Sequence, residues 1–149
     1  ILQTAFGTQA LPVLTPPWNR IGGSVTAALP GWGYHGISTY RPRRAPMPVS
    51  GLSQVNTHVD LIDWHGSGGF IGAEAALGLI VTHLQSRRCG AAELTEPTGI
   101  LTHHLVHDAP TWAFLVYLQD WLSKQPMIRW VPTGELFRRN VAGSNWETR

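Results

Sequence analysis

Residues 57–85, THVDLIDWHGSGGFIGAEAALGLIVTHLQ, decide the fold of this chain. The first part, residues 57–64, is rich in β-branched and apolar side chains, which predicts a strand buried on both faces. Glycines at positions 66, 68 and 69 end this strand. Apolar residues then recur at the i, i+3, i+4 spacing of an amphipathic helix over residues 73–85, and Gly90 is its predicted stop.

The flanking sequence continues this alternation of strand and helix. Further strands are predicted over residues 11–14, 36–39, 100–101 and 127–131, and further helices over residues 24–29 and 109–124. The last helix has a typical start, because Asp108 can accept free amide hydrogens and Pro110 tolerates the first turn. Prolines and glycine over residues 40–51 predict an extended loop. The alternation favours a mostly parallel sheet with helical crossovers, either open or curved into part of a barrel.

Length and composition exclude several classes of protein. A chain of 149 residues is long enough for one domain with its own core, and 43% hydrophobic residues argue against disorder. No apolar run approaches the roughly 20 residues of a membrane span. The net charge of +2 is too small to indicate nucleic-acid binding, and prolines interrupt the one arginine cluster, at positions 41, 43 and 44. A single cysteine, Cys89, allows no internal disulfide.

Polar and aromatic residues gather where three of the predicted strands end. They are Trp18, Asn19 and Arg20 after the first strand, Asp60, Asp63 and Trp64 at the third, and His103, His104, His107 and Asp108 after the fourth. In barrels and open α/β sheets the carboxyl ends of the strands form one face, and active sites are built there. We therefore expect these three clusters to converge.

Three of these segments resemble motifs of the polysaccharide deacetylases (carbohydrate esterase family 4, the NodB homology domain). Pro16-Pro17-Trp18 resembles the family's Arg-x-Pro-Tyr motif, DLIDW at residues 60–64 matches Asp-x-x-Asp-Trp, and LTH at residues 101–103 matches Leu-x-His. Order and approximate separations agree from about residue 11 to 137. The resemblance implies one partial domain over residues 1–149, with the parallel-strand (β/α) barrel-like fold of the C-terminal part of a distorted TIM-like deacetylase barrel.

The resemblance also implies a reaction, the metal-dependent hydrolysis of N-acetyl amide bonds in an N-acetylated amino-sugar polysaccharide or oligosaccharide. By resemblance, His103 is the general acid that protonates the leaving amine, and Asp63 is its orienting partner. A carboxylate beside an imidazole favours the imidazolium, which can donate a proton. The positions implied to bind substrate are Trp18 through its backbone amide, Arg20, Asp60, and Trp64 and Leu101 around the acetyl methyl group.

The metal of that family, usually zinc, poses a difficulty for this sequence. Its ligands come from a paired-aspartate strand end and a His-x-x-x-His motif that both precede the proline motif, and the residues before Pro16 contain neither. Thr15 also stands where the family has an arginine. His103 and His107 have His-x-x-x-His spacing and would face one metal if the segment were helical. We expect no stoichiometric zinc and no deacetylase activity in these 149 residues alone.

A second class of function is also consistent with the sequence, a noncatalytic carbohydrate-binding or interaction domain that keeps a tryptophan-lined cleft and lacks the metal. Structural roles are open for the same residues: Asp63 and His103 as a buried pair, and Asp108 as a helix cap. The histidines His58 and His83 are interpreted as hydrogen-bonded or surface residues. Periodic apolar faces or a strand predict core positions for Trp112, Trp121 and Trp130.

Overall fold

The computed structural model describes residues 2–138, which form a mixed α/β structure with five α-helices and short parallel sheets. These residues divide into two compact units. The first unit contains residues 2–39, 43–55 and 132–138, and the second contains residues 40–42 and 56–131. That residues 1–149 form a single domain stays a prediction.

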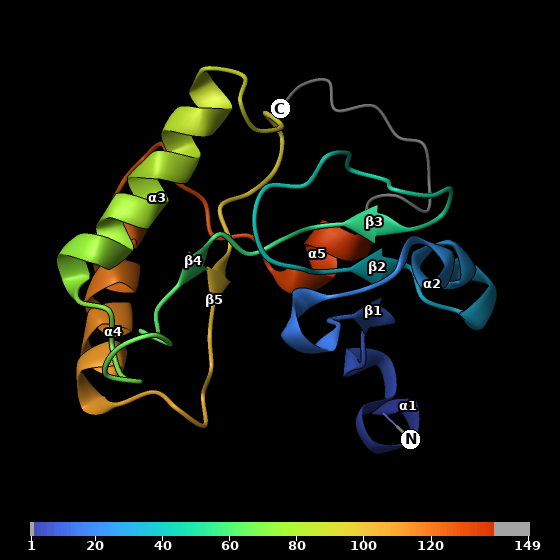
Figure 1. The fold of residues 1–149 in the computed structure, drawn as a ribbon, viewed down its shortest axis with the longest axis horizontal. Coiled ribbons are helices and arrows are strands. Elements are labelled where there is room, and N and C mark those ends of the chain that lie inside the picture. The colour runs from blue at the N-terminus through green and yellow to red at the C-terminus, as the bar shows by residue number, and fades with distance from the viewer. Residues whose placement is uncertain (1, 139–149) are drawn as a thin grey trace. The chain divides into compact units, whose positions relative to one another are not determined.

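The first unit contains a three-stranded parallel sheet in the order β1-β2-β3 (Figure 1). Its strands are β1 (Val13–Leu14), β2 (Gly36–Ile37) and β3 (Ser53–Gln54). Its helices are α1 (Leu2–Phe6), α2 (Gly23–Ala28) and α5 (Thr133–Arg138). Leu29, Ile37 and Leu52 form its core, each at most 2% exposed.

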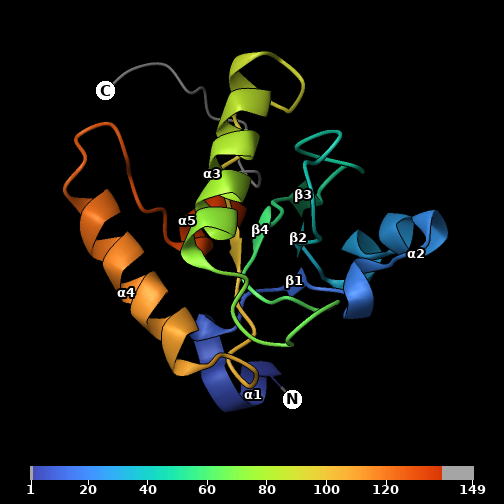
Figure 2. The ribbon, with the colours of Figure 1, turned by 60° about the vertical axis from the view of Figure 1, so that its left-hand side comes forward.

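The second unit contains a two-stranded parallel sheet and the two long helices. Strand β4 (Val59–Asp60) pairs with β5 (Ile100–Leu101) (Figure 1), and the long helices are α3 (Ala73–Arg88) and α4 (Ala109–Ser123), whose axes diverge in Figure 2. The buried residues that join these elements are Val59, Leu61, Ala76, Phe114 and Leu118. Apolar side chains from both helices therefore cover β4 and the residue that follows it.

The start of α4 confirms the predicted cap. Asp108 precedes the helix, and its carboxylate accepts hydrogen bonds from the backbone N–H of Thr111 at 2.9 Å and from the Thr111 hydroxyl at 2.6 Å. These bonds from Thr111 lower the pKa of Asp108. The second carboxylate oxygen accepts from the backbone N–H of Phe70 at 3.2 Å. Asp108 thus also holds the loop that follows β4.

The strands are shorter than the sequence predicts. Only Val59–Asp60 of residues 57–64 is a strand, because the chain turns after Asp60 and Ile62 forms an antiparallel bridge with Phe70. The strand predicted over residues 127–131 is wrong, since this segment has no regular structure between Pro126 and Pro132. Strand β3 and helices α1 and α5 were not predicted. Parallel pairing is confirmed for both sheets, and the described strands form no closed barrel.

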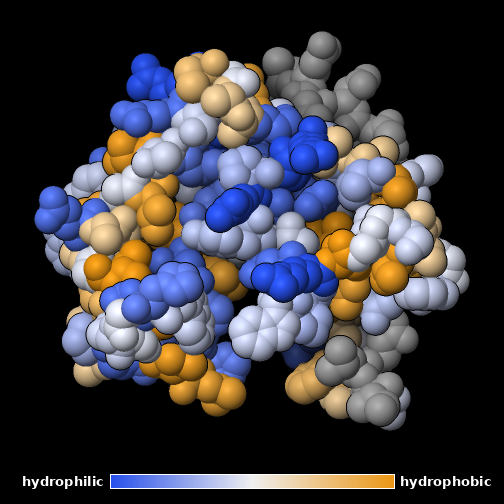
Figure 3. Space-filling model, viewed as in Figure 1, coloured by the Kyte–Doolittle hydropathy of each residue, from blue (hydrophilic) through white to orange (hydrophobic). Residues whose placement is uncertain are grey.

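Both long helices occur where predicted, but their buried faces differ from the prediction. On α3, Ala76 is buried and Ile80 packs on the core, whereas Leu77, Val81 and Leu84 are exposed. The predicted core positions of three tryptophans are wrong: Trp112, Trp121 and Trp130 are each 48–49% exposed. Figure 3 shows apolar side chains at the surface over α3 and α4. No helix within residues 2–138 has the length and apolar character that crossing a bilayer requires.

Candidate functional site

The carboxyl ends of β4 and β5 bring Asp60 and His103 together. Asp60 is the last residue of β4 and lies opposite Leu101 in the parallel register, and His103 follows two residues after Leu101. The Nε2 atom of His103 lies 3.3 Å from Oδ1 of Asp60. The side chains of His103 and Asp60 are 27% and 19% exposed, so the pair is shielded but reachable from solvent.

Asp60 also fixes Trp64. The indole N–H of Trp64 donates to Oδ2 of Asp60 at 2.9 Å, and the backbone N–H of Ile62 donates to Oδ1 at 3.1 Å. The Trp64 ring meets the His103 ring edge-on, with centroids 4.9 Å apart. One carboxylate therefore orients both aromatic side chains, and the indole of Trp64 stays 53% exposed.

Tyr40 is a neighbour of Asp60 that the sequence analysis missed. Burial, and then the charge of Asp60, raise the pKa of the Tyr40 hydroxyl, although a hydrogen bond with the backbone of Asp60 acts in the other direction. The hydroxyl is therefore protonated at neutral pH. Tyr40 opens a proline-rich loop, and no spacing in the sequence links it to Asp60.

Asp63 does not have the predicted contact. Its Oδ2 atom accepts from the backbone N–H of Ser67 at 3.1 Å, and its backbone N–H donates to the carbonyl of Gly69 at 2.9 Å. Asp63 thus closes the loop that follows β4. The carboxylate partner of His103 is Asp60, which corrects the prediction that Asp63 orients the imidazole. The reason is that β4 ends at Asp60, so strand alternation does not extend to Asp63.

His103 and His107 do not form a helical His-x-x-x-His pair. Residues 104–106 form a turn, and the backbone N–H of His103 donates to Nε2 of His107 at 2.9 Å. This bond occupies the lone pair that a metal would need, so the two residues do not fit a shared metal. Burial, and then the neighbouring His103, lower the pKa of His107, which keeps its ring neutral at pH 7.

The structure therefore brings together Asp60, Trp64, Leu101 and His103 within one unit. Trp18 and Arg20 belong to the other unit, and their contribution to the site stays a prediction. Trp18 lies in the short 3-10 helix Pro17–Asn19 with its side chain 90% exposed. Its backbone φ of 57° is in the left-handed region, as is that of Asn19 at 55°, a strained conformation for a residue with a Cβ.

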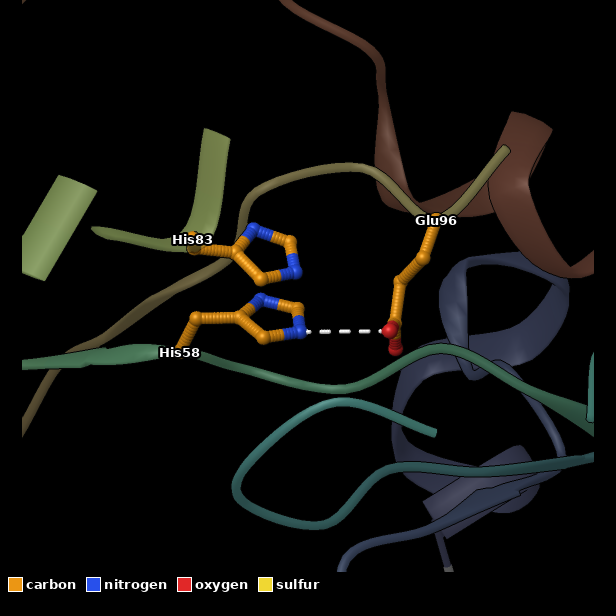
Figure 4. A group of neighbouring side chains, drawn as sticks. All are labelled: His58, His83 and Glu96. Carbon is orange, nitrogen blue, oxygen red and sulfur yellow. Dashed lines mark ion pairs between the residues drawn. The ribbon is translucent and has the colours of Figure 1, made fainter. Parts of the chain in front are cut away.

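A second cluster of polar side chains is buried inside the second unit. His58, His83 and Glu96 are 6%, 4% and 0% exposed, and one potential ligand atom from each lies within 4.8 Å of the others (Figure 4). The imidazole rings stack with centroids 3.5 Å apart and 17° between their planes. His83 is on the core face of α3, one helical turn after Ile80. Helical periodicity could have placed His83 there, but no local pattern connects it to Glu96.

Two histidines and a carboxylate are the residue types of many zinc sites, but the hydrogen bonds of this cluster do not fit a metal. The backbone N–H of Gly99 donates to Nδ1 of His58 at 3.0 Å, so the proton of the neutral ring is on Nε2. That N–H faces Oε2 of Glu96 at 3.4 Å and has no lone pair for a cation. Within residues 2–138, no other group of three potential ligands is close enough to share an ion.

His83 makes the stability of this cluster dependent on pH. Burial, and then the adjacent His58 ring, lower the pKa of His83 to about 4. The unfolded chain, with an ordinary histidine pKa of about 6.5, binds more protons between the two values, so stability is lost as the pH falls through this window.

We expect the wild-type chain to lose on the order of 2 kcal/mol more unfolding free energy between pH 7 and pH 4.5 than the variant His83→Asn. Urea denaturation of both proteins at the two pH values measures this difference. Carboxylates titrate in both proteins, and their contribution cancels. Equal losses in the two proteins would show that the His83 ring is not held neutral.

Comparisons with protein-family models, with curated proteins and with solved structures find no match for this chain.

Proposed function

We propose that the cluster of Asp60, Trp64 and His103 is the acid side of an amide hydrolase site that acts on N-acetylated amino-sugar polymers. The observation that carries the proposal is the Asp60 carboxylate, which lies at the carboxyl end of a parallel strand and contacts both His103 and Trp64. The order of three deacetylase-like motifs in the sequence supports the same reading. On this proposal the β4–β5 pair is part of a deacetylase-like (β/α) barrel.

On this proposal the two ring nitrogens of His103 have different roles. Nε2 faces Oδ1 of Asp60 at 3.3 Å, so on this proposal the carboxylate orients the imidazole ring. The proton that His103 gives to the leaving amine is then the one on Nδ1. Tyr40, next to Asp60, is a neutral hydroxyl that adds no charge to the pair.

Trp64 supplies the contact with the sugar. An indole combines a broad apolar face with one N–H donor. Here Asp60 accepts from the donor, and about half of the side chain is exposed, so its face is open to a sugar ring or an acetyl methyl group. Leu101, opposite Asp60 in the register, adds apolar surface at the same strand ends.

The remaining chemistry of the proposal is not supplied by the described residues. The divalent metal implied by the resemblance activates water and polarises the amide carbonyl when bound. Neither the pair of His103 and His107 nor the buried cluster fits that ion, for the reasons given above. A role of the Trp18 backbone amide toward the oxyanion stays a prediction of the resemblance.

Release of acetate from an N-acetylated chitooligosaccharide tests the proposal. The assay compares this 149-residue chain with the product of the complete coding sequence, each supplied with zinc. If the complete product carries the paired-aspartate and His-x-x-x-His motifs upstream, we expect it to release acetate. We expect the 149-residue chain not to do so, because an acid and an apolar surface do not replace an activated water. A complete product that binds the oligosaccharide without releasing acetate would favour the carbohydrate-binding alternative.

A further inference from the structure

Strands β4 and β5 are fastened to each other at their beginnings by His58 and Gly99. The backbone N–H of His58 donates to the carbonyl of Gly99 at 2.7 Å, and the backbone N–H of Gly99 donates to Nδ1 of His58 at 3.0 Å. Each residue immediately precedes its strand, Val59–Asp60 or Ile100–Leu101. The imidazole thus extends the pairing of the strands by one side-chain hydrogen bond.

Glu96 faces the other nitrogen of the His58 ring. Oε2 of Glu96 faces Nε2 of His58 at 3.4 Å, and Oε1 accepts from the backbone N–H of Asn56 at 3.3 Å. Glu96 and Gly99 belong to the segment that leads into β5, whereas Asn56 and His58 lead into β4. The two segments are therefore connected through one buried imidazole. Its Nδ1 accepts from Gly99, and its Nε2 faces the Glu96 carboxylate.

The far ends of the same two strands carry the candidate acid pair. Asp60 lies two residues after His58, and His103 lies four residues after Gly99. A shift of β5 by one residue along β4 would move His103 by about 3.3 Å, which is enough to break its contact with Asp60. With only two residues in each strand, the ladder itself gives little resistance to such a shift.

We propose that His58 is a positioning residue, which sets the register of β5 on β4 and thereby places His103 against Asp60. A contribution of His58 to catalysis rests on the function proposed above. Its effect on the register of the two strands does not. The cluster of His58, His83 and Glu96 is accordingly a structural hydrogen-bonded unit that serves the site at the strand ends, and it is not a metal site.

Two substitutions of His58 separate its two nitrogens. In His58→Asn, the amide oxygen takes the place of Nδ1 and still accepts from Gly99. In His58→Gln, the amide group takes the place of Nε2 toward Glu96, and the acceptor for Gly99 is lost. Both variants remove the same ring and its stacking on His83. A difference between them therefore reports the bond to Gly99.

The readout is the indole N–H signal of Trp64 in a proton–nitrogen NMR spectrum of the chain, assigned by its loss in Trp64→Phe. This N–H donates to Asp60, and its ring contacts His103, so the signal and its Overhauser contacts to His103 report the pair. We expect His58→Asn to retain the wild-type shift and contacts, and His58→Gln to lose both. The indole signals of Trp112 and Trp121 on α4 show that each variant is folded.

Unchanged Trp64 signals in folded His58→Gln, or equal loss in both variants, would overturn the positioning role. Zinc chloride at one equivalent tests the metal alternative: we expect no change in the ring signals of His58 and His83. One bound zinc per chain that is lost in Glu96→Gln would likewise overturn the proposal. Activity is a separate measurement, because a complete product without deacetylase activity would contradict the proposed function and leave the NMR result standing.

Discussion

Replacing His103 by alanine is expected to lower the turnover of the complete gene product on N-acetylated chitooligosaccharide by about 100-fold or more, with little change in KM. A general acid acts on the leaving amine in the transition state, and its loss therefore affects turnover more than ground-state binding. Rates of acetate release over a range of substrate concentrations separate the two parameters. Full activity of His103→Ala would direct the search for the acid to His104 or His107.

Asp60 and Asp63 provide a matched pair of carboxylates for the same assay. Asp60 contacts the imidazole of His103, whereas Asp63 accepts from the backbone N–H of Ser67. We expect Asp60→Asn to lower turnover by about 10-fold or more, because the proposed acid loses the carboxylate that orients its ring. Asp63→Asn should mainly weaken its loop. A larger loss of turnover in Asp63→Asn than in Asp60→Asn would favour Asp63, the partner that the sequence predicts, over Asp60.

The helices were predictable from the sequence because their signals are local. Asp108 and Pro110 mark the start of α4, and the apolar repeat after Gly72 marks α3. The buried faces were less predictable. An apolar repeat shows that a helix has an apolar face, but it does not show how much of that face the rest of the chain covers. On α4, Phe114 and Leu118 fill the core, whereas Trp112 and Trp121 stay half-exposed.

The candidate site was predictable only in part, because motif order identifies segments and not contacts. The sequence placed Asp60, Trp64 and His103 at strand ends, and the structure joins them. Choosing between Asp60 and Asp63 required knowing that β4 ends at Asp60. Glu96 lies 38 residues after His58 in the sequence, and the two meet only through tertiary structure. A charged side chain such as Glu96 is expected at the surface, but Glu96 is buried.

The pairing of β4 with β5 also predicts a large effect of adding one methyl group. An alanine Cβ at position 99 would lie 2.5 Å from the backbone carbonyl oxygen of Asn56 and 3.0 Å from Cα of Thr57. These are backbone atoms, which cannot rotate away, so one strand would have to move. We expect Gly99→Ala to lower the unfolding free energy by about 2 kcal/mol or more, measured by urea denaturation.

Gly78→Ala is the matched control, because it adds the same methyl group in the same unit. Gly78 lies within α3, and a Cβ there would meet no atom within 4 Å apart from its chain neighbours and the nearby backbone of its own helix. Alanine favours the helix over glycine, so this variant should raise the unfolding free energy by about 0.5–1 kcal/mol. The close approach of the β4 and β5 segments at Gly99 therefore predicts opposite signs for the change in unfolding free energy of the two variants. A neutral Gly99→Ala would mean that these segments are farther apart than described, and the register that places His103 against Asp60 would lose its support.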